Sequence, residues 1–160
     1  YLQDINFTAN FSDISIIGHS TGGGSGHLYC LRNQCNKLIL QDPYFVPVVE
    51  KLSNIELRTD TYFIYSEDWY SNYENPEYTT EIQVYRNFLT NESLAKGYYL
   101  TDSAHYDFVA FGAVSPLTKY TFLKGTIDYR DSIFINNKFN LQALQGEEIT
   151  TSEFIKIASP

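Results

Sequence analysis

Residues 18–22 read Gly-His-Ser-Thr-Gly, which places a serine between two glycines in the pattern G-x-S-x-G. A serine hydroxyl becomes a useful nucleophile when a base takes its proton and an acid orients that base. In a nucleophile elbow the serine occupies a strained strand-to-helix turn with its hydroxyl exposed, and the flanking glycines make room for it. The pattern therefore predicts that Ser20 is a nucleophile.

The chain has three histidines that could act as the base. In enzymes with this kind of turn, the acid and the base follow the serine in the chain order Ser, Asp or Glu, His. His19 is adjacent to the serine and is expected to point elsewhere, and His27 is expected to be a partly exposed residue of the following helix. His105 lies far enough downstream, in a loop just after a predicted strand, and is the predicted base.

Two strand ends offer an acid for this base. Functional groups in parallel sheets gather at the carboxyl ends of the strands. Asp60 precedes its strand and is excluded on that ground. Asp42 directly follows one predicted strand, and Glu67 and Asp68 directly follow the next. The pattern does not choose between the two ends, and each carboxylate could equally be a solvated loop residue.

Short apolar strands alternate along the chain with helical or loop segments, which favours an α/β fold with a mostly parallel sheet and flanking helices. Strands are predicted at 14–18, 37–41, 61–66 and 97–101. Helices are predicted at 21–33 and 131–144, with further helical segments at 1–10 and 79–91. An acidic, tyrosine-rich loop is predicted at 67–81 and a tail after about residue 146. We interpret residues 1–160 as part of a single domain.

Charge, composition and motif spacing argue against several kinds of function. The formal net charge is −8, which argues against nucleic acid as a partner. No apolar run approaches the roughly 20 residues that a membrane-spanning helix needs. The glycine run at 18–26 lacks the Lys-Ser/Thr of a P-loop and the spacing of G-x-G-x-x-G. A metal site around Asp102, His105 and Asp107 is disfavoured, because no second histidine or cysteine lies nearby.

Two further features bear on the compartment. Cys30 and Cys35 are either a pair of buried thiols or a local disulfide that ties a helix end to the next strand. The triplets that begin at Asn6, Asn10 and Asn91 match the acceptor pattern for N-glycosylation. Together these features favour a secreted protein.

Four segments also carry a resemblance to a known family: 18–24, 40–47, 103–108 and 123–125. From about residue 13 to 146 the chain resembles the plasma-type platelet-activating-factor acetylhydrolases and the related dienelactone-hydrolase-like and polyester-hydrolase-like esterases. The resemblance implies an α/β-hydrolase fold and ester hydrolysis through an acyl-enzyme, without a metal or cofactor.

The same resemblance implies roles for individual residues. It places the nucleophile at Ser20, the base at His105 and an oxyanion donor at the backbone N–H of Thr21. In the acetylhydrolase branch the acid matches Asp42, whereas in the polyester-hydrolase branch Asp68 would stand in. The stretch Asp-Pro-Tyr-Phe-Val-Pro at 42–47 favours Asp42.

The family has several strands before the elbow, and a loop there donates a second oxyanion N–H. We therefore expect this chain to be the C-terminal half of the domain, with the N-terminal strands missing or on another chain. The implied substrates are short-acyl or lipid esters such as platelet-activating-factor-like phospholipids. The aromatic and acidic side chains of the loop at 67–81 would suit a cationic head group. The alternative is a catalytically inactive hydrolase-like module used for binding or structure.

Overall fold

The computed structural model describes residues 13–48, 51, 59–71, 94–109 and 125–157, and these contain one five-stranded sheet. Its strands, in chain order and in spatial order, are β1 (Ser15–His19), β2 (Lys37–Gln41), β3 (Asp60–Ser66), β4 (Ala95–Leu100) and β5 (Phe154–Lys156). The first four strands are parallel, and β5 pairs with β4 in the antiparallel direction. The predicted α/β-hydrolase-like fold with a mostly parallel sheet is confirmed.

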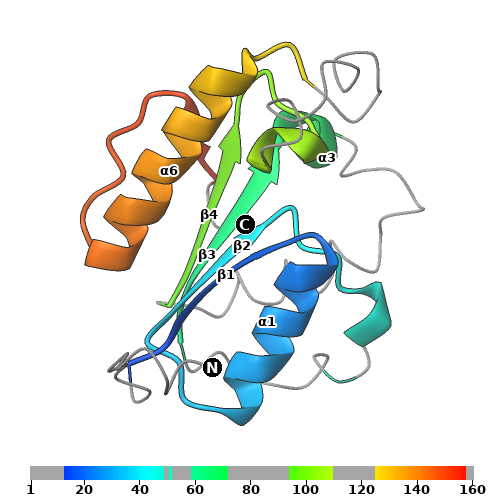
Figure 1. Cartoon of the computed structure of the whole chain (residues 1–160), viewed down its shortest axis with the longest axis vertical. Coiled ribbons are helices and arrows are strands. Elements are labelled where there is room, and N and C mark those ends of the chain that lie inside the picture. Colours follow the sequence, from blue (N-terminus) through cyan, green and yellow to red (C-terminus); the bar gives the residue numbers. More distant parts are fainter. Residues whose placement is uncertain (1–12, 49–50, 52–58, 72–93, 110–124, 158–160) are drawn as a thin grey trace, which may run out of the picture.

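Helices cover both faces of this sheet (Figure 1). Helix α1 (Thr21–Arg32) packs on one face against Leu38 and Leu40, and helix α6 (Tyr129–Gln145) packs on the other against Ile39. Successive side chains of a strand point to opposite faces, so the Leu-Ile-Leu run of β2 contributes to both cores. Central strands of parallel sheets are apolar on both faces for this reason.

Three short helical segments lie in those parts of the connections that the structure describes. They are η2 (Val46–Val48), α3 (Glu67–Ser71) and η5 (His105–Phe108). Helix α3 follows β3 directly and η5 lies just beyond the end of β4, so both stand at the carboxyl edge of the sheet (Figure 1). This edge is where the predicted site residues converge.

The predicted strands and the two long helices are confirmed within a few residues of their observed ends. Two other predictions are wrong. Residues 67–71 form α3 rather than loop, because Glu67 and Asp68 supply acidic side chains to the first turn of a helix. The tail after residue 146 contains β5, whose Phe154 packs on Phe139 of α6. The helical segments predicted at 1–10 and 79–91 lie outside the described residues.

Cys30 and Cys35 form a disulfide with a Cα–Cα distance of 5.3 Å. Both side chains are buried in the core between α1 and the sheet. The bond joins the end of α1 to the turn before β2, which is one of the two arrangements that the spacing left open. None of the helices in the described part of the chain is both long and apolar enough to cross a membrane.

β1 forms one edge of the sheet within the described residues, since its pairing there is with β2 alone. Its burial differs from that of the central strands. Ile17 is 46% exposed, whereas Ile39, its partner in the β2 register, is fully buried. The face of the sheet that carries Ile17 and Ile39 is therefore less covered at β1 than at β2.

Candidate active site

Ser20 occupies a strained turn between β1 and α1. Its backbone has φ 54° and ψ −126°, a conformation that L-residues rarely adopt. The turn is held on both sides, because the Ser20 N–H donates to the carbonyl of Gln41 at 3.0 Å and the Ser20 carbonyl accepts from the N–H of Tyr44 at 2.8 Å. Strain of this kind persists only where the surrounding structure over-determines it.

Gly18 makes this turn sterically possible. A Cβ atom at that position would lie 2.6 Å from the carbonyl oxygen of Gly22, closer than atoms can approach. The strand must therefore pass against the first turn of α1 without a side chain at residue 18. The strand, tight turn and helix predicted from the G-x-S-x-G pattern are confirmed in the structure.

The first turn of α1 presents backbone N–H groups beside Ser20. The first four N–H groups of a helix have no partner within the helix. Those of Gly23 and Gly24 donate to the Ser20 carbonyl at 2.9 and 3.3 Å. Within the described residues, the N–H groups of Thr21 and Gly22 have no backbone acceptor, and they lie at the positive end of the helix dipole. This arrangement can stabilise negative charge that develops next to the serine.

Asp42 follows β2 directly and also has a positive φ, of 39°. Its side chain has no exposed surface. Oδ1 accepts from the backbone N–H of Ser66 at 2.7 Å, and Oδ2 accepts from the hydroxyl of the same residue at 2.6 Å. A buried carboxylate requires such donors, because burial without hydrogen bonds would be costly. The end of β3 thus fixes the carboxylate at the end of β2.

The imidazole of His105 lies against this carboxylate. Its Nδ1 is 3.3 Å from Oδ2 of Asp42, and its side chain is only 10% exposed. Trp69 of α3 stacks on the ring, with centroids 5.0 Å apart and an interplanar angle of 23°. Asp42 and Trp69 together restrict both the direction and the tilt of the imidazole.

The other candidate carboxylates have different surroundings. Oε2 of Glu67 accepts from the backbone N–H of Asp102 at 2.5 Å, and Asp68 is exposed. Asp60 begins β3 at the opposite edge of the sheet, where it forms ion pairs with Lys37 and Lys96 at 3.2 Å each. Of the carboxylates considered from the sequence, the structure brings Asp42 into contact with His105.

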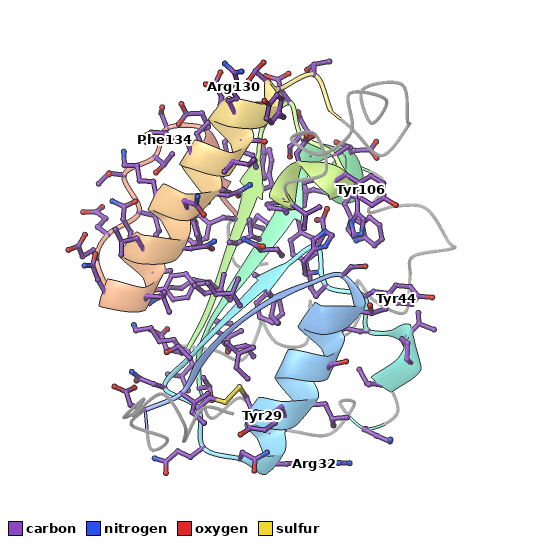
Figure 2. All side chains as sticks on the ribbon, in the orientation of Figure 1. Tyr29, Arg32, Tyr44, Tyr106, Arg130 and Phe134 are labelled. Carbon is purple, nitrogen blue, oxygen red and sulfur yellow. A yellow bond between two sulfur atoms is a disulfide. The ribbon has the colours of Figure 1, made fainter. Side chains whose placement is uncertain are left out.

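Strand register brings Ser20 to the same place. His19 pairs with Gln41 in the parallel β1–β2 ladder, so Ser20 and Asp42, the next residues, leave adjacent strands at the same edge. Tyr44 and Tyr106, which follow Asp42 and His105 closely in the chain, lie on the same side of the molecule in Figure 2. The serine, the carboxylate and the imidazole therefore share one edge of the sheet, as the sequence predicted for groups at strand ends.

His19 does not point away from this site, and the prediction that it does is wrong. Its Nε2 is 2.9 Å from the backbone carbonyl of His105, and the two imidazole rings have centroids 4.4 Å apart. Burial, followed by the nearby charge of His105, lowers the pKa of His19. A polar residue next to a candidate nucleophile was visible in the sequence, but its partner lies 86 positions away.

His27 is also placed differently from the prediction. It has no exposed surface, and its ring lies 5.7 Å from that of Phe45 and 6.4 Å from that of Phe63. Burial lowers the pKa of His27 to about 4. His27 is a core residue because it lies on the face of α1 that packs against the sheet.

The loop that carries His105 is anchored by Asp107. This carboxylate is 1% exposed, and its Oδ2 accepts from the N–H of Ala104 at 2.9 Å and from that of Gly125 at 2.8 Å. Within the described residues, no group of three or more His, Cys, Asp or Glu side chains could hold a metal ion. Asn6, Asn10 and Asn91 lie outside the described part of the chain, as do Tyr73 and Tyr78 of the acidic segment.

The chain is similar along its length to a known protein family. The family described as platelet-activating factor acetylhydrolase, isoform II, matches residues 1–159. No curated protein matches the chain.

Proposed function

Since this chain belongs to the platelet-activating factor acetylhydrolase isoform II family and is a hydrolase of that type, we propose that it is a serine esterase that acts through an acyl-enzyme. The observation that carries the proposal is the contact between Asp42 and His105, 3.3 Å long, at the sheet edge where Ser20 occupies its strained turn. We assign Ser20 as nucleophile, His105 as base and Asp42 as acid.

The reaction proceeds in two halves. His105 takes the proton from Oγ of Ser20, and Oγ attacks the ester carbonyl carbon to form a tetrahedral intermediate. His105 then gives this proton to the leaving alcohol oxygen as the C–O bond breaks, which leaves an acyl group on Ser20. In the second half His105 deprotonates a water, the hydroxide attacks the acyl carbon, and the carboxylic acid leaves as Ser20 regains its proton. Asp42 stabilises the imidazolium and does not itself take the proton.

The oxyanion of each intermediate would accept from the N–H of Thr21 at the start of α1. Removal of one such donor typically costs about 3 kcal/mol of transition-state stabilisation, so a second donor matters. We assign the second donor to strands beyond β1, as part of the same domain or on another chain. The half-exposed Ile17 on the edge strand supports this assignment, because both faces of a parallel sheet are normally covered.

The substrate we propose is a short-acyl or lipid ester, such as a platelet-activating-factor-like phospholipid. The family's name supports the acyl group, and the surroundings of His105 support the head group. Trp69 stacks on the base, and Glu67 and Asp68 precede it in α3. Aromatic rings and carboxylates together attract a quaternary ammonium. A phosphocholine ester that is hydrolysed no faster than a plain short-chain ester would remove this part of the proposal.

A fluorophosphonate probe tests the esterase directly. We expect the probe to modify Ser20 in the complete protein and p-nitrophenyl acetate to be turned over, with both signals lost in Ser20→Ala. Ser25→Ala is the matched control, because Ser25 is an exposed serine on α1 five positions later. If the probe labels another residue, or labels no residue of the folded protein, the alternative of a catalytically inactive module is favoured over the esterase.

We also propose that the protein is secreted, which the Cys30–Cys35 disulfide supports. The acceptor triplets at Asn6, Asn10 and Asn91 would then carry N-linked glycans. Expression in a eukaryotic secretory host tests whether these triplets carry glycans, because treatment with an endoglycosidase reduces the mass only of a glycosylated protein.

A further inference from the structure

We infer that His19 is a positioning residue which holds His105 in place by a hydrogen bond to its backbone carbonyl. The inference rests on the proposed function, because it assigns a role relative to Ser20 and His105. The mechanism proposed above gives His19 no role of its own.

The direction of the hydrogen bond follows from its partner. A carbonyl oxygen only accepts, so Nε2 of His19, 2.9 Å away, carries the hydrogen and donates. Burial and the neighbouring His105 lower the pKa of His19, which favours the neutral ring with its proton on Nε2. The ring then adds no positive charge beside a base that must itself become positive.

The location of this bond gives it a specific consequence. Several other hydrogen bonds of the His105 loop join it to parts of the molecule away from β1, among them those from the N–H of Gly125 to the carboxylate of Asp107 and from the amide of Asn136 to the carbonyl of Asp107. His19 is the last residue of β1 and is covalently joined to Ser20. Its hydrogen bond therefore links the strand of the nucleophile to the loop of the base.

The two rings also touch, with centroids 4.4 Å apart and an interplanar angle of 37°. His19 could thus act through its ring or through its N–H. The carbonyl of His105 belongs to a residue that is 8% exposed, so loss of the donor would leave an acceptor without ready access to water. A displacement of about 1 Å between reacting groups can cost about 100-fold in rate.

Three substitutions separate the N–H from the ring. His19→Phe keeps an aromatic ring and removes the donor. His19→Gln removes the ring and places an amide N–H the same number of bonds from the backbone as Nε2. His19→Asn keeps an amide but is one carbon too short to reach. Turnover of p-nitrophenyl acetate and amide hydrogen exchange across residues 103–109 are measured for each variant and the wild type.

We expect His19→Phe and His19→Asn to lower kcat by at least about tenfold with little change in KM, and to speed exchange in the loop. We expect His19→Gln to stay within about threefold of the wild type in both measurements. Wild-type exchange in His19→Phe and His19→Asn overturns the inference, as does a loss of kcat in His19→Gln as large as that in His19→Phe.

The exchange measurement keeps this inference separate from the proposed function. Hydrogen exchange reports whether His19 holds the loop even in a protein that hydrolyses nothing. If the wild type neither turns over the ester nor reacts with a fluorophosphonate, the proposed esterase function is wrong. If the wild type does both and His19→Phe behaves in the same way, the role inferred for His19 is wrong and the esterase function stands.

Discussion

The hydroxyl of Ser66 donates a 2.6 Å hydrogen bond to Oδ2 of Asp42, the same oxygen that faces Nδ1 of His105. Ser66 ends β3 and is fully buried. Its backbone N–H donates to the other oxygen of the carboxylate at 2.7 Å. The orientation of the proposed acid is thus set by one residue from the neighbouring strand.

Ser66→Ala removes the hydroxyl and keeps the backbone donor. We expect kcat for a short-chain ester to fall by about tenfold and the free energy of unfolding to fall by about 1–3 kcal/mol, because a hydrogen bond to a charged, buried group is lost. Thr61→Val is the control, since it removes another buried hydroxyl from β3, at the end remote from the site. A similar loss of kcat in both variants would show that the effect is one of stability alone.

Replacement of the candidate acids distinguishes the two strand ends. We expect Asp42→Asn to lower kcat by about 10³–10⁴-fold, because the amide no longer stabilises the imidazolium. Asp68→Asn changes an exposed residue and is expected to stay within about threefold of the wild type. Steady-state kinetics with p-nitrophenyl acetate measures both, and the reverse order of the two effects would assign the acid to α3.

His27 predicts a pH dependence of stability. Its pKa is about 4 in the folded protein and about 6.5 when unfolded. Between these values the unfolded state binds the proton and the folded state does not, so the free energy of unfolding decreases as the pH falls from about 6.5 to 4. The decrease from this group is about 3 kcal/mol.

His27→Leu tests this, because leucine has a similar volume and does not titrate. Urea unfolding at several pH values should give a shallower decrease below pH 6.5 than in the wild type. The lowered pKa of His19 acts in the same direction in both proteins, so the difference between their slopes isolates His27. Parallel curves would mean that His27 does not remain neutral in the fold.

The disulfide predicts a modest stabilisation. Cys30 and Cys35 are five positions apart, and a loop of that size restricts the unfolded chain by about 2 kcal/mol. We expect the double variant Cys30→Ala and Cys35→Ala to lose about this much free energy of unfolding. Dithiothreitol should destabilise the wild type by a similar amount and leave the double variant unchanged; an equal effect of the reductant on both proteins would contradict the prediction.

Local features of the sequence were predictable because their causes are local. Glycines around Ser20 allow a tight turn, and the apolar run of β2 requires burial on both faces. These residues predicted the strand, the turn and the helix around Ser20 together with the parallel sheet. Helix α3 was missed because five residues are too few to show a helical pattern in the sequence. Strand β5 was missed because it is also short and packs against α6 through Phe154 and Phe139.

The sequence by itself thus determined where a serine is held on a strained turn, and it predicted a histidine that lies at the same edge of the sheet. Tertiary structure decided which carboxylate faces that histidine, that Ser66 holds the carboxylate and that His19 holds the base loop. The physical reason is chain separation. Asp42 and His105 are 63 positions apart and His19 and His105 are 86 apart, so strand register and burial, rather than neighbouring residues, set their contacts.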